Sequence, residues 1–73
     1  MYGVENMMTG REQKILTLVI EGKTNKEIAK IIGASDFTVR EHVSSILHKI
    51  GVRSRVELLA AEIKKLENQK NNR

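Results

Sequence analysis

Short polar side chains gather on one side of an amphipathic segment that spans residues 36–50. At about 100° per residue, Arg40, Glu41 and Ser44 fall on one face together with Phe37, whereas Val39 and the other aliphatic residues fall opposite. Such side chains can hydrogen-bond to the edges of DNA bases, because an α-helix fits the major groove. The pattern therefore indicates a DNA-reading surface, although the acid at position 41 opposes binding to a polyanion.

Other kinds of chemistry find little support in the sequence. Cysteine is absent, and the two histidines, His42 and His48, lie about 120° apart on one helix, which does not suit a shared metal ion. No acid–base pair, nucleophile constellation or phosphate-binding loop occurs, so we expect no catalytic residue, cofactor or small-molecule substrate. Only two aromatic residues are present, Tyr2 and Phe37, which argues against a stacking platform for RNA.

The composition is that of one small domain. The chain has 73 residues, of which 40% are hydrophobic, and a formal net charge of +4 that favours an anionic partner. No apolar run is long enough to span a membrane, and residues 1–10 lack the features of a signal peptide. We therefore expect a cytoplasmic, nucleoid-associated protein.

Capping residues divide the chain into four expected helices. Thr9, Thr24 and Ser54 each precede a glutamate by three residues, as in a capping box, and Ser35 is also a favourable N-cap. The expected helices cover about 10–21, 25–32, 36–50 and 55–67, and the first three stop at Gly22, Gly33 and Gly51. The short turn before the third helix matches a helix-turn-helix. The prediction is one all-α domain over 9–67, after a flexible segment 1–8 and before a polar tail 68–73.

The stretch "LTLVIEGKTNKEIAKIIGASDFTVREHVSSILHKIGVRSRVELLA" resembles the LuxR-type (GerE-like) helix-turn-helix domain of bacterial transcription regulators. The shared pattern runs from Arg11-Glu12 through "GKTNKEIA" and "TV" to "GV" and Arg55, and it covers roughly residues 8–63. The resemblance implies a four-helix domain that binds double-stranded DNA as a homodimer. Its third helix would enter the major groove, and its fourth would supply the dimer contact.

The resemblance also implies roles for individual residues. Base contacts fall on Arg40, Glu41 and Ser44. Backbone contacts fall on Thr24, Lys26, Ser35, Thr38, His42 and Lys49. Three positions depart from the usual pattern: Ala34 replaces a branched aliphatic residue, Phe37 replaces a polar or basic one that contacts phosphate, and Glu41 is an unusual acid at a reading position. Glu41 could accept from cytosine and repel guanine, while Arg40 favours guanine.

Several of these residues also have a purely structural interpretation. Arg40 could pair with Asp36 four residues earlier, but such a pair contributes only about 0.3 kcal/mol, against about 1–3 kcal/mol for a bidentate guanine contact. His42 could be a partly buried structural histidine. Lys26 could lie on a solvated face, and Glu41 could remain in water at the edge of the groove.

The expected fourth helix carries two apolar stripes. Val56, Leu59, Ala60 and Ile63 share one side, which we assign to the core. The other side, which includes Leu58, Ala61 and Glu62, is the predicted dimer interface, unless the core face is simply wide. By the resemblance, Arg11-Glu12 and Arg55 are expected to form structural ion pairs. Arg53 and Arg55 beside the start of this helix could equally be solvated or contact phosphate.

The sequence thus predicts a homodimeric, sequence-specific transcriptional regulator that binds an inverted-repeat site on double-stranded DNA. The alternative is an interaction module that dimerises with a related regulator and inhibits it. Duplex binding that weakens with salt would distinguish the first from the second.

Overall fold

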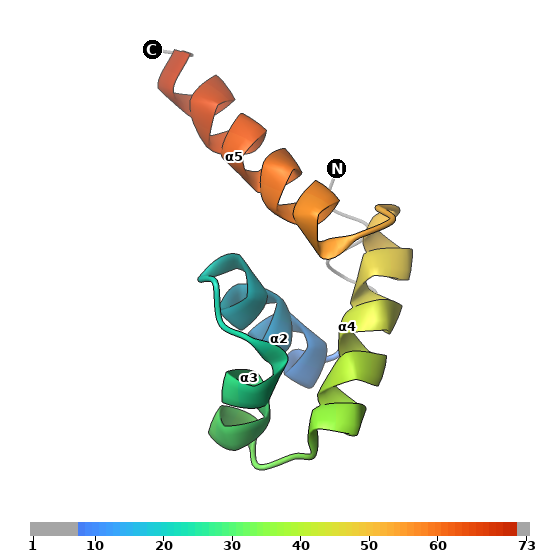
Figure 1. The fold of residues 1–73 in the computed structure, drawn as a ribbon. Helices are drawn as coiled ribbons and strands as arrows, with labels where there is room; N and C mark the ends of the chain where they lie inside the picture. The colour runs from blue at the N-terminus through green and yellow to red at the C-terminus, as the bar shows by residue number, and fades with distance from the viewer. Residues whose placement is uncertain (1–7, 72–73) are drawn as a thin grey trace.

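Four α-helices make up the part of the chain that the structure, a computed structural model, describes (residues 8–71; Figure 1). They are α2 (Gly10–Ile20), α3 (Asn25–Ile32), α4 (Asp36–Ile50) and α5 (Arg55–Asn71), and these residues contain no strand. The predicted all-α fold with four helices is therefore confirmed. The predicted flexible segment and polar tail lie partly outside the described residues.

The helix starts follow the predicted capping residues. At α2, the Glu12 amide donates to Thr9 Oγ1 at 3.1 Å and the Thr9 amide donates to Glu12 Oε1 at 3.0 Å. The same reciprocal pair joins Thr24 and Glu27 at the start of α3. These contacts satisfy backbone N–H groups that a helix start otherwise leaves without partners.

A tight turn connects α3 to α4, and its conformation depends on Gly33. This residue ends α3 in the left-handed region, with a φ of 72°. Glycine adopts this region without the steric cost that a Cβ imposes. The Ala34 amide then donates to the Ala29 carbonyl at 2.9 Å, which closes the turn directly before the N-cap of α4. The path of the chain between the two helices is therefore stabilised by local contacts.

The core lies where α2, α3 and α4 meet. Ile15 of α2, Ile28 of α3, and Val39 and Ile46 of α4 are almost completely buried. Met8 is also buried against this cluster, although it was predicted to lie in the flexible N-terminal segment. A single apolar residue before a helix cap has no periodicity, so its burial could not be detected from the sequence pattern.

Helix α5 packs against α2 near its beginning and then extends past the other three helices (Figure 1). Leu58 anchors it in the core with 5% of its surface exposed. The helix continues to Asn71, beyond the predicted end at residue 67. Neither glycine nor proline interrupts the sequence after Gly51, so polar composition alone does not end the helix.

Candidate nucleic-acid interface

The start of α3 presents backbone N–H groups beside lysine side chains. Thr24 caps the helix, Lys26 in its first turn is exposed, and Lys23 before the cap is half-buried. Hydrogen bonding from the Thr24 amide, helped by the nearby Lys23 charge, lowers the pKa of the Glu27 carboxyl. The positive end of the helix dipole and Lys26 together form a favourable place for a phosphate group.

Two hydroxyl groups, those of Ser35 and Thr38, lie at the start of α4. The Thr38 amide donates to Ser35 Oγ at 3.0 Å, as expected for an N-cap. The Ser35 hydroxyl in turn donates to Thr38 Oγ1 at 2.9 Å. The two hydroxyl groups therefore lie within hydrogen-bonding distance of each other at the start of α4.

The outer face of α4 carries the residues predicted to read bases. Arg40, Glu41 and Ser44 are exposed, whereas Thr38 and His42 are half-buried at the margins of this face. The opposite face is occupied by the core, so α4 has one free side and one packed side. The structure thus brings the three predicted base-reading residues together on the free side.

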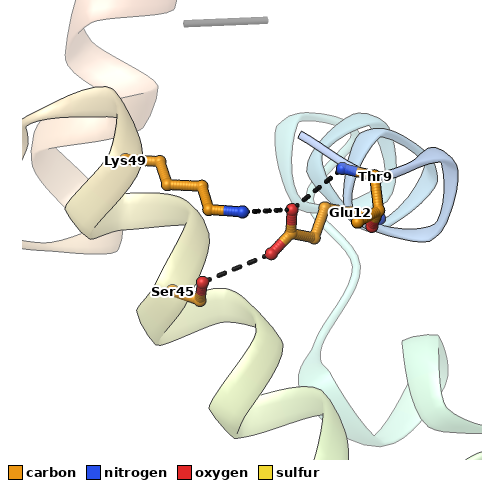
Figure 2. A network of polar contacts seen from close by, with 4 residues as sticks. All are labelled: Thr9, Glu12, Ser45 and Lys49. Carbon is orange, nitrogen blue, oxygen red and sulfur yellow. Dashed lines mark hydrogen bonds and ion pairs between the residues drawn. The ribbon is translucent and has the colours of Figure 1, made fainter. Parts of the chain in front are cut away.

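Lys49, which was predicted to contact the DNA backbone, has a partner within the protein. Its ammonium group donates to Glu12 Oε1 at 2.8 Å (Figure 2). The Lys49 side chain is 27% exposed. The same carboxylate accepts from the Thr9 amide and from the Ser45 hydroxyl, the latter at 3.2 Å. These bonds, Lys49 first, lower the pKa of Glu12. Lys49 therefore links α4 to α2, and its contact with the DNA backbone stays a prediction.

The partner of Glu12 could not be read from the sequence. The carboxylate belongs to a structural ion pair, as the family pattern implied, but Lys49 lies 37 positions further along the chain. No local spacing rule connects two residues at that separation. Ser45, the second α4 residue that contacts Glu12, was missed for the same reason.

Arg55 connects the beginning of α5 to the beginning of α3. Its Nη1 donates to Asn25 Oδ1 at 2.6 Å, and its Nη2 donates to the Lys23 carbonyl. By the resemblance Arg55 was expected in a structural ion pair, and its position left a solvated role or a phosphate contact open. The structure instead gives it partners within the protein, on both sides of Thr24.

The predicted dimer face of α5 is partly wrong. Leu58, assigned to that face, is 5% exposed and belongs to the core. Val56 and Ile63, assigned to the core, are 75% and 57% exposed. Hydropathy gave two apolar stripes on α5, but it could not show which one faces α2. Of the other predicted interface residues, Ala61 is exposed and Glu62 half-buried, and their role stays a prediction.

Within residues 8–71, no helix is sufficiently long and apolar to cross a membrane. The same part of the chain contains no cluster of three or more histidine, cysteine, aspartate or glutamate residues arranged to hold a metal ion.

Comparisons of the sequence with known proteins identify a family and several relatives. The family described as "Bacterial regulatory proteins, luxR family" matches residues 6–61. The chain is 41% identical over 63 residues to the uncharacterized response regulatory protein YgeK of Escherichia coli (strain K12), covering 86% of this chain and 43% of YgeK. It is 41% identical over 59 residues to the transcriptional regulatory protein DesR of Bacillus subtilis (strain 168), covering 81% of this chain and 30% of DesR.

A shorter relative gives a more complete overlap. The spore germination protein GerE of Bacillus subtilis (strain 168) is 42% identical over 57 residues, which are 73% of this chain and 77% of GerE. The chain spans less than half the length of YgeK and of DesR, so the comparison with those two concerns a part of each. With the family pattern matched over most of its length and the helix-turn-helix in place, this chain belongs to the luxR family of bacterial regulatory proteins.

Proposed function

We propose that this protein is a sequence-specific, double-stranded DNA-binding transcriptional regulator, with α4 in the major groove. The observation that carries the proposal is the free face of α4, where Arg40, Glu41 and Ser44 are exposed together within a luxR-family helix-turn-helix. Two relatives are named as regulatory proteins, DesR and YgeK, which supports the same class of function. A chromosomal target would place the protein with the nucleoid in the cytoplasm.

Contacts to the DNA backbone fix the position of α4 in the groove. Thr24 and Lys26 at the start of α3, and Ser35 and Thr38 at the start of α4, offer N–H, hydroxyl and ammonium donors to phosphates. His42 at the margin of the free face adds a ring N–H to this set. These contacts give affinity and salt dependence without sequence preference.

Base contacts supply the sequence preference. Arg40 can donate two hydrogen bonds to guanine, and Glu41 can accept one from cytosine N4. Formally α4 is neutral, because Asp36 and Glu41 balance Arg40 and Lys49. Since Lys49 already pairs with Glu12, the surface that α4 presents to DNA contributes more to discrimination than to general attraction.

The protein acts as a homodimer through the outer face of α5. Val56, Ala60 and Ile63 recur at helical spacing and are all exposed, as is Leu66 one turn further along. A second copy related by a two-fold axis would cover this stripe and place two α4 helices in successive major grooves. The binding site would then be an inverted repeat with half-sites about one helical turn apart.

Selection of bound sequences from a random duplex library tests the proposal. We expect recovery of an inverted repeat, and an affinity that falls steeply as salt rises. Glu41→Ala should change the recovered sequence, whereas an alanine substitution of a residue without a base contact should leave it unchanged. Failure to bind any duplex, with dimerisation retained, would refute the proposal and favour an inhibitory interaction module.

A further inference from the structure

Phe37 is an exposed aromatic residue that the fold of the monomer does not use. It is the second residue of α4, and 64% of its surface is exposed. An aromatic side chain contributes to stability mainly by removing its apolar surface from water. With most of that surface still in water, Phe37 contributes little to the packing of the domain.

The position of Phe37 on α4 is central to the reading face. At about 100° per residue, its direction lies about 60° from that of Arg40 on one side and about 40° from that of Glu41 on the other. Ser44, seven residues further, points within about 20° of it. All four side chains are exposed in the structure. Phe37 therefore stands between the two charged residues proposed to contact bases.

The chemistry of the groove leaves few partners for a phenyl ring at this place. Phosphate oxygens and the polar base edges need hydrogen-bond donors or acceptors, which the ring lacks. The 5-methyl group of thymine is the apolar group that bases display in the major groove. The first residues of a recognition helix are also those that reach base edges.

We propose that Phe37 recognises thymine by packing its ring against the 5-methyl group, next to the base pairs that Arg40 and Glu41 contact. This inference rests on the proposed function and adds one base preference to it. The ring and the methyl group would also exclude water from the polar contacts of Arg40 and Glu41 on either side of them. Phe37 stands where the luxR-type pattern usually has a polar or basic residue that contacts phosphate. At this position a base contact would thus replace a phosphate contact.

Replacement of thymine by deoxyuridine tests the contact, because it removes the methyl group and preserves base pairing. In a duplex recovered by selection with the full chain, each thymine is replaced in turn and binding is measured. We expect one thymine in each half-site to respond, with a loss of about two- to fivefold in affinity for each methyl group removed. Substitution in both half-sites should multiply the two losses.

Phe37→Ala is the matched protein variant. It should bind thymine and deoxyuridine duplexes equally at the responsive position, which completes a double-mutant cycle. Ile31→Ala is the control, because Ile31 is also an exposed apolar residue, 48% exposed, but lies on α3. This variant should retain the preference for thymine. Thermal unfolding of both variants checks that the fold is intact.

The possible results separate this inference from the proposed function. Salt-dependent binding to a selected site, with no thymine that responds to loss of its methyl group, would overturn the role of Phe37 alone. A thymine response that persists in Phe37→Ala would do the same. If no duplex is bound at all, the proposed function fails and the thymine contact fails with it.

Discussion

Truncation of Leu58 should destabilise the folded domain, whereas truncation of Ile63 should weaken the dimer. Leu58 is 5% exposed and holds α5 against the core. Replacement of a buried leucine by alanine costs about 2–5 kcal/mol, and less where the surrounding side chains can move into the cavity. For Leu58, which lies between helices, we expect about 3 kcal/mol. A domain of 73 residues has a free energy of unfolding of roughly 4–11 kcal/mol. Leu58→Ala should therefore remove a large part of the stability.

Ile63 is 57% exposed in the monomer, so its truncation should change the free energy of unfolding of the monomer by no more than about 0.5 kcal/mol. In the proposed dimer both copies of this side chain become covered. Loss of roughly 1 kcal/mol of apolar burial from each copy would weaken dimerisation by about 30-fold. The two substitutions thus act on different equilibria.

Urea unfolding at several protein concentrations measures both effects. Circular dichroism gives the midpoint of unfolding, and sedimentation equilibrium gives the dimer dissociation constant. We expect Leu58→Ala to lower the midpoint at every concentration, and Ile63→Ala to remove the dependence of the midpoint on concentration. If Leu58→Ala left the midpoint unchanged and abolished the dimer, the assignment of the two faces of α5 would be refuted.

Three further predictions concern the interface and its supports. Lys26→Ala should weaken binding to all duplexes to a similar extent and reduce the salt slope by about 1, as measured by fluorescence anisotropy; a change in the preferred sequence would contradict a phosphate contact. The pKa of Glu12 is held below its ordinary value of 4.5, so the stability that it contributes is present above that pH and is lost as the pH falls through the lowered pKa. Glu12→Gln should therefore make the urea midpoint less dependent on pH in the acid range, and an unchanged pH profile would count against the ion pair with Lys49. Arg55→Gln should lower the free energy of unfolding by about 1–2 kcal/mol and speed hydrogen exchange near Asn25, whereas normal exchange there would show that the Arg55 contacts are dispensable.

Local signals in the sequence predicted most of the fold. Each N-cap satisfies backbone groups within three residues, so the beginnings of α2, α3 and α4 follow directly from Thr9, Thr24 and Ser35. The turn before α4 depends on Gly33 in the same local way. The separation of α4 into a buried and a free face was also predictable, because its aliphatic residues gather on one face.

Contacts between distant segments were not predictable in this way. Lys49 could be identified as a basic residue near the end of α4, but its pairing with Glu12 depends on how α4 crosses α2. Likewise, α5 has apolar residues on two sides, and only the packing of the finished core shows that Leu58 faces inward. The errors of sequence interpretation therefore fall where two solutions are locally equivalent and long-range packing selects one.

The contacts of Arg55 have a consequence for the architecture of the DNA site. Through its hydrogen bonds to Asn25 and Lys23, this side chain ties the start of α5 to the start of α3 in the helix-turn-helix. In a dimer joined through α5, the distance and rotation between the two reading helices would then be fixed. Such a protein would not tolerate extra base pairs between its half-sites, because an insertion of about half a helical turn places them on opposite sides of the double helix. Recognition would extend to the phase of the DNA helix as well as its sequence.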